Sequence, residues 1–121
     1  MDTTETYTKM CDCPEIQDNH MWVMGDWIWD KTNNEWNILC SCCHNYEHYL
    51  LSMYIWLPTQ DQIQEMMKFG SDIPIKWHIW LSDITGQLTD YYERFTSMEQ
   101  LWLAFYLKEK YNKFWDGQDW V

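Results

Sequence analysis

Aromatic side chains crowd a strongly acidic sequence. Ten tryptophans, eight tyrosines and four phenylalanines occur among 121 residues whose formal net charge is -11. Because so much aromatic surface cannot all lie in water, it must form a compact core, a binding face or both. A hydrophobic share of 46% also argues against disorder, which requires low hydrophobicity together with high charge. The chain is therefore expected to fold.

The length of the chain is that of one ordinary domain. We predict a single domain over residues 1–121, with a loose tail over residues 1–9. No apolar run of about 18 residues occurs, and the first five residues lack the basic and apolar regions of an export signal. A cytoplasmic protein without membrane contact is therefore expected.

The charge balance bears on the class of partner. Nineteen Asp and Glu face eight Lys and Arg, so phosphate backbones and anionic lipids are repelled, and direct binding of nucleic acid is not expected. Residues 1–60 are the acidic pole, with nine acids and two bases. Two interpretations remain open. The carboxylates form a solvated coat that keeps an aromatic-rich chain in solution, or they imitate nucleic acid and occupy a basic groove on another protein.

Alternating apolar and polar residues predict the strands. Turn residues at 31–34 separate two such stretches, which indicates a β-hairpin with Trp27 or Trp29 facing Trp36 across the strands. The pattern predicts four or five strands in all, over residues 22–29, 36–43, 51–56, 75–82 and, as the fifth, 88–95.

Capping patterns predict two helices. Thr59 and Gln62 form a capping box that begins a helix over residues 59–69, and two overlapping boxes at residues 96–100 begin another that ends near Asn112. After it, an Asp-Gly turn between Trp115 and Trp120 predicts a C-terminal mini-hairpin. The predicted fold is α+β: a mainly antiparallel sheet of four to five strands, two helices on one side and the mini-hairpin.

The cysteines are the reactive residues of the sequence. Five is an odd number, and without an export signal they are expected to be reduced thiols. Their spacing allows a zinc site, although each pair has one intervening residue where zinc knuckles have two to four. The alternative is that they are small buried apolar side chains. The candidate metal ligands are Cys11, Cys13, Cys40 and Cys42, with His44 or His48 as substitutes.

Other catalytic patterns are missing from the sequence. It has no zinc-hydrolase motif and no glycine-rich phosphate loop, so an enzyme is not expected and no catalytic residue is assigned. In the predicted strand 75–82, Trp80 lies on the face opposite the aliphatic residues, where an exposed indole among acids suits protein recognition. The candidate partner-binding residues are Trp80, His78, Asp26, Asp30 and Glu35.

Three segments carry a resemblance to a known group. Residues 13–17, 56–66 and 108–117 resemble small uncharacterised accessory proteins of tailed phages and prophages of Firmicutes. This resemblance implies a phage-derived protein in the cytoplasm of the bacterial host. It implies a non-enzymatic role in binding a host protein, such as a nucleic-acid-handling defence enzyme of the CRISPR effector type. Two alternatives remain: a small zinc-binding module or hydrolase that uses the Cys/His cluster, and a nucleotide-sequestering sponge.

Overall fold

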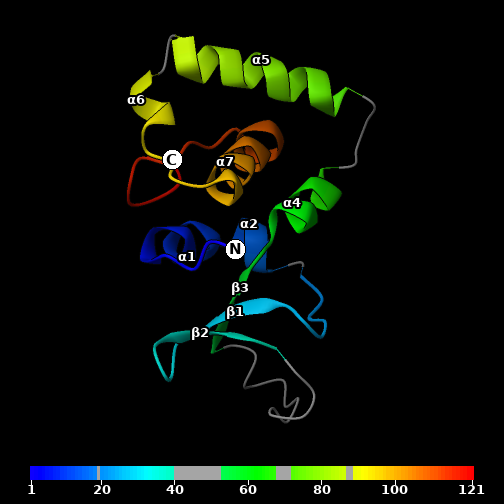
Figure 1. Ribbon diagram of the computed structural model, residues 1–121, viewed down its shortest axis with the longest axis vertical. Coiled ribbons are helices and arrows are strands. Elements are labelled where there is room, and N and C mark those ends of the chain that lie inside the picture. Colours follow the sequence, from blue (N-terminus) through cyan, green and yellow to red (C-terminus); the bar gives the residue numbers. More distant parts are fainter. Residues whose placement is uncertain (19, 40–52, 68–71, 87–88) are drawn as a thin grey trace. The chain divides into compact units, whose positions relative to one another are not determined.

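The chain folds into helices and a small antiparallel sheet (Figure 1). The structure, a computed structural model, describes residues 1–18, 20–39, 53–67, 72–86 and 89–121. Contacts between residues divide it into two compact units, which we call the N-terminal unit (residues 1 and 3–59) and the C-terminal unit (residues 2 and 60–121). Each unit is described by itself, and the single domain over residues 1–121 stays a prediction.

The N-terminal unit contains a three-stranded sheet and two short helices. The sheet has the order β2-β1-β3, and both pairings are antiparallel. Helices α1 and α2 pack on β3. The elements of this unit are α1 (Glu5–Cys11), α2 (Pro14–Gln17), β1 (Trp27–Asp30), β2 (Glu35–Ile38) and β3 (Tyr54–Leu57).

Residues 5–11 are helical, so the prediction of a loose tail over residues 1–9 is wrong. The Thr4 hydroxyl accepts a hydrogen bond from the Tyr7 backbone N–H and caps α1. Tyr7, Met10 and Cys11 share one face of the helix and are all buried. The Tyr7 hydroxyl donates to the Pro58 carbonyl at 2.6 Å, which ties α1 to the end of β3. Tertiary burial of this face stabilises a helix too short to persist alone.

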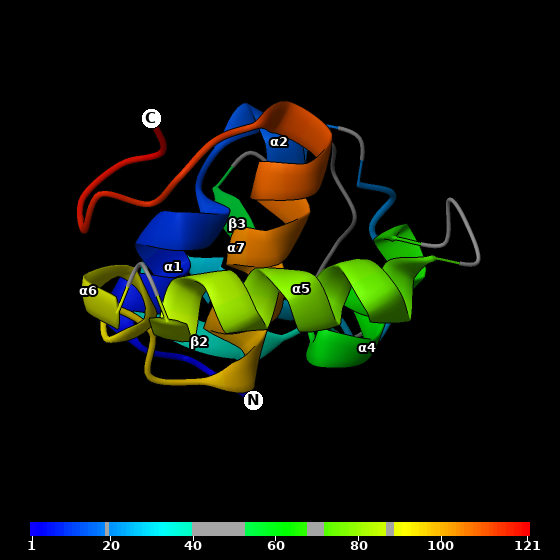
Figure 2. The same cartoon turned by 90° about the horizontal axis from the view of Figure 1, so that it is seen from above.

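The C-terminal unit is built around one buried helix. Its elements are α4 (Gln60–Met66), α5 (Ile73–Gly86), α6 (Thr89–Tyr92) and α7 (Met98–Tyr111). Residues 100–107 of α7 are all buried, as expected of a helix covered on every side. Helix α5 crosses α7 (Figure 2), and the Trp77 ring stacks on the Trp102 ring at 3.8 Å.

The caps of α7 form as the sequence predicts. The Ser97 hydroxyl accepts the Gln100 backbone N–H at the start of the helix, and Asn112 closes it in the left-handed conformation, with φ 54°. Asp2 belongs to this unit as well. Its carboxylate accepts hydrogen bonds from the Ser97 hydroxyl and the Gln100 side-chain amide, at 2.6 and 2.8 Å. Negative charge at a helix N-terminus is favourable, so this contact strengthens the start of α7.

The predicted strands over residues 75–82 and 88–95 are absent from the described residues of these segments, which contain α5 and, from residue 89, α6. The α5 sequence alternates apolar and polar residues over a few positions, which led to the strand prediction. The burial follows a helical period instead, with Ile73, Trp77, Trp80 and Ile84 on the inner side. The described residues therefore contain three strands and six helices, not the predicted four to five strands and two helices. The α+β class is confirmed.

The C-terminal mini-hairpin is present. Trp115 and Trp120 form an antiparallel bridge, and their ring centroids are 5.1 Å apart. Gly117 supplies the positive φ of the turn, at 104°. The backbone N–H groups of Gln118 and Asp119 donate to the Asp116 carboxylate and lower its pKa below the ordinary value.

We predict that Tyr7→Phe lowers the free energy of unfolding by about 1–2 kcal/mol, because a buried hydrogen bond to the Pro58 carbonyl is lost without a replacement. Urea unfolding followed by tryptophan fluorescence measures the change. Tyr92→Phe is the matched control, since Tyr92 is exposed and should leave stability nearly unchanged. Equal stability losses in the two variants would contradict this role for Tyr7.

Candidate functional site

One face of the sheet in the N-terminal unit is apolar from β3 to β2. Residues directly opposite one another on paired strands share a face. The register pairs Trp29 with Trp36 and Ile55, and Trp27 with Ile38 and Leu57. This face therefore carries six apolar side chains, three of them tryptophans.

The apolar face is buried at one edge and exposed at the other. Ile55 and Leu57 on β3 are buried, Trp27 and Trp29 on the central strand are half-buried, and Trp36 and Ile38 on β2 are 49% and 40% exposed. The Trp27 and Trp36 ring centroids are 5.2 Å apart. We call Trp27, Trp29, Trp36 and Ile38 the tryptophan face. Trp36 and Ile38 remain available to a partner.

The turn between β1 and β2 holds Trp36 in place. Asp30 is buried, and its carboxylate accepts hydrogen bonds from the backbone N–H groups of Thr32 and Asn33 and from the Asn33 side chain. Asn34 takes a positive φ of 57°, which its short polar side chain tolerates. Burial, and then the Asp30 carboxylate, raise the pKa of Tyr54 above its ordinary value. The predicted hairpin is confirmed, with Trp29 opposite Trp36.

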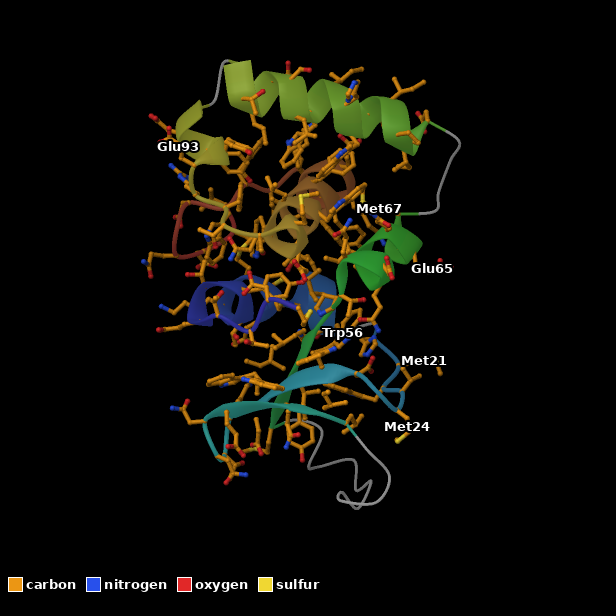
Figure 3. All side chains as sticks on the ribbon, in the orientation of Figure 1. Met21, Met24, Trp56, Glu65, Met67 and Glu93 are labelled. Atoms are coloured by element: carbon orange, nitrogen blue, oxygen red, sulfur yellow. The ribbon has the colours of Figure 1, made fainter. Side chains whose placement is uncertain are left out.

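A hydrogen bond between His20 and the buried Asp26 shapes the segment that precedes β1. The His20 ring lies 2.7 Å from the Asp26 carboxylate and stacks on Trp56 with ring centroids 3.5 Å apart. The Val23 backbone N–H donates to the same carboxylate at 2.9 Å, and Gly25 and Asp26 exchange backbone hydrogen bonds with Leu39. Met21 and Met24 point outward from this segment (Figure 3), and both are exposed.

The structure changes the role of several predicted partner-binding residues. Trp80 is 4% exposed because it lies on the inner side of α5, so the expectation of an exposed indole is wrong. Asp26 and Asp30 are buried and hold backbone groups, as described above. His78 and Glu35 are exposed, in α5 and β2 respectively. Of the five predicted partner-binding residues, His78 and Glu35 are therefore the exposed ones.

The predicted metal ligands are only partly described. Cys11 is buried and Cys13 is half-buried, whereas Cys40 and Cys42, like His44 and His48, lie outside the described residues. Within the described ranges, no group of three His, Cys, Asp or Glu side chains is arranged to hold a metal ion. The zinc site stays a prediction.

No helix in the described residues is long and apolar enough to cross a membrane.

Sequence reasoning missed the exposure of Ile38, Met21 and Met24. The hairpin pattern placed Trp36 and Ile38 on one face, but a pattern within one strand does not show that the strand lies at a sheet edge. A usable signal was the apolar run at residues 21–24, which ends at Gly25 without alternation.

Comparison with known families, curated proteins and solved structures found no match to this chain.

We predict that Asp26→Ala destabilises the segment at residues 20–26, because the Val23 N–H and the His20 ring then lose a buried charged acceptor. The expected loss of stability is about 2–3 kcal/mol, typical of a hydrogen bond to a buried charged group. Hydrogen exchange of the Val23 amide should become faster. Asp18→Ala is the control, because Asp18 is exposed. Unchanged exchange at Val23 would show that Asp26 does not hold this segment.

Proposed function

We propose that this protein is a non-enzymatic protein-binding module whose tryptophan face docks on a basic surface of a partner. The observation that carries the proposal is the exposure of Trp36 and Ile38 beside the Trp27 ring, on a sheet whose opposite edge is buried. Tryptophan is enriched among the residues that dominate binding energy in protein interfaces. The hydrogen-bonded turn between β1 and β2 supports the proposal further, because an ordered hairpin loses less conformational freedom on binding.

The size of the exposed apolar surface is adequate for an anchor. A tryptophan side chain offers roughly 150–250 Å² of contact surface, and about half of Trp36 is still accessible to water. At about 25 cal/mol per Å², burial of that half contributes about 2–3 kcal/mol to binding. Ile38 adds to this value. These two residues would form the centre of the interface.

The charge of the chain favours a basic partner. The residues of the N-terminal unit include eight acids and two bases, Lys9 and Lys31. Asp26 and Asp30 are buried, but the excess of carboxylates in this unit still attracts a cationic protein at long range and repels phosphate. An arginine side chain is the best contact for an exposed indole, since the guanidinium binds the face of the ring. We therefore propose a partner surface rich in arginine.

A narrower form of the proposal concerns the origin of the protein and its target. A basic groove that binds nucleic acid is a surface of the required kind, because carboxylates can replace the phosphates that it normally holds. A phage protein that blocks a host defence enzyme, such as a CRISPR effector, would act in this way. The acidic charge and the tryptophan face support this form, and competition with DNA tests it.

We predict that Trp36→Ala weakens binding to an arginine-rich peptide by about tenfold or more, the loss expected of an anchor residue. Isothermal titration calorimetry at low salt measures the dissociation constant. Met98→Ala is the matched control, since it removes an exposed apolar side chain of α7 outside the tryptophan face. Equal affinity of the two variants would overturn the role of the tryptophan face.

Salt dependence and competition with DNA distinguish the proposal of a module that binds a basic protein surface from the narrower proposal of an inhibitor that occupies a nucleic-acid-binding groove. Binding should weaken as ionic strength rises from about 0.01 to 0.15 M, because the Debye length falls from about 30 to about 8 Å. For a candidate host nuclease, the wild-type chain should displace DNA at low salt and Trp36→Ala should do so less well. Trp36-dependent peptide binding without displacement of DNA would refute only the narrow form.

A further inference from the structure

Helix α5 has an apolar side that its own unit does not cover. Trp77 and Trp80 face α7, whereas Ile75 and Ile79 are 64% and 57% exposed on the other side. Figure 3 shows side chains along the side of α5 that is turned away from α7. Around the two isoleucines lies a shallow hollow of about 410 Å³, lined by Pro74, Ile75, His78, Ile79, Ser82 and Asp83. Two large aliphatic side chains one helical turn apart are typical of a helix that packs on another helix.

We propose that this side of α5 binds a second copy of the chain, with the two α5 helices antiparallel about a two-fold axis near Ile79. An interface of this symmetry must be complementary to itself. Helix α5 meets this condition because it carries one base and one acid two turns apart, Lys76 and Asp83. Both residues line the hollow between α5 and α7, so they share one flank of the helix.

The pairing of charges follows from the symmetry. When the two Ile79 side chains lie at the axis, Lys76 of one copy lies opposite residue 82 of the second copy. Asp83 of the second copy is the next residue along that helix, so it lies close to this lysine. The two-fold axis repeats this contact, so the interface contains two ion pairs that flank the isoleucines. The Lys76 side chain is 48% exposed and is held at 3.4 Å from Asp72 and 3.8 Å from Glu109, so its ammonium group remains near the flank. Antiparallel helices also align their dipoles favourably.

The net charge limits the strength of this association. Each copy carries a charge of -11, so two copies repel each other unless salt screens them. One helix pair also buries less surface than a standard interface. The dimer should therefore be weak, depend on protein concentration and be favoured at about 0.15 M salt over low salt. This inference does not rest on the tryptophan face, which belongs to the N-terminal unit.

Ile79→Asp tests the apolar centre of the interface. Sedimentation velocity over a range of protein concentrations should show a dimer for the wild-type chain, and Ile79→Asp should weaken it by at least about tenfold. Met98→Asp is the matched control, because it makes the same change of charge at an exposed apolar residue outside α5. Circular dichroism confirms that both variants fold. A wild-type chain that stays monomeric at every concentration, or equal weakening by both variants, would overturn the proposal.

A charge reversal tests the ion pairs. Asp83→Lys lowers the net negative charge, and so it should strengthen association if only overall repulsion matters. The proposed pairing predicts the opposite result, because the introduced lysine would face Lys76 of the second copy. Glu93→Lys makes the same change of charge at an exposed position outside α5 and should strengthen the dimer or leave it unchanged. Stronger association of Asp83→Lys would refute the antiparallel register.

Discussion

Stacking of aromatic rings is the interaction that each unit is built on. In the C-terminal unit, the Trp77 and Trp102 rings are 3.8 Å apart and nearly parallel, and this contact joins α5 to α7. In the N-terminal unit, the His20 ring stacks on Trp56 in the same manner, and the Asp26 carboxylate fixes the histidine from its edge. Stacked aromatic pairs contribute about 0.5–1.5 kcal/mol beyond the burial of their surface.

This use of tryptophan also has a cost. The indole N–H groups of Trp56, Trp80 and Trp102 are buried and have no hydrogen-bond partner among the described residues. An unpaired buried donor costs about 1–3 kcal/mol. Burial of the large indole surfaces offsets this cost. The chain therefore gains stability from the area and stacking of these rings, while their polar atoms oppose it.

The sequence predicted those parts of the fold that depend on short-range rules. The caps of α7, the β1–β2 hairpin and the turn between Trp115 and Trp120 each follow from a few adjacent residues, and all three are present. Helix α5 could not be predicted in this way, since β-branched and aromatic residues favour strands locally. Its helical state depends on contacts of Trp77 with α7, which lies more than 20 residues along the chain.

Short-range sequence rules also failed to predict which residues of the candidate site are exposed. Exposure was predicted for Trp80, Asp26 and Asp30 from residue type and strand alternation, and all three are buried. The two aspartates are buried because their carboxylates accept backbone N–H groups that would otherwise lack partners. By contrast, the exposed edge of the tryptophan face depends on strand order, which a single sequence does not reveal. Glu35 and His78 were predicted at the surface and lie there.

The parallel stack of Trp77 and Trp102 has a spectroscopic consequence. Two indoles at this separation couple their electronic transitions, so they do not absorb as two independent tryptophans. The far-ultraviolet circular dichroism of this chain therefore contains an aromatic contribution on top of the backbone signal. Helix content calculated from that spectrum alone will be in error, whereas the aromatic contribution itself reports whether α5 lies on α7.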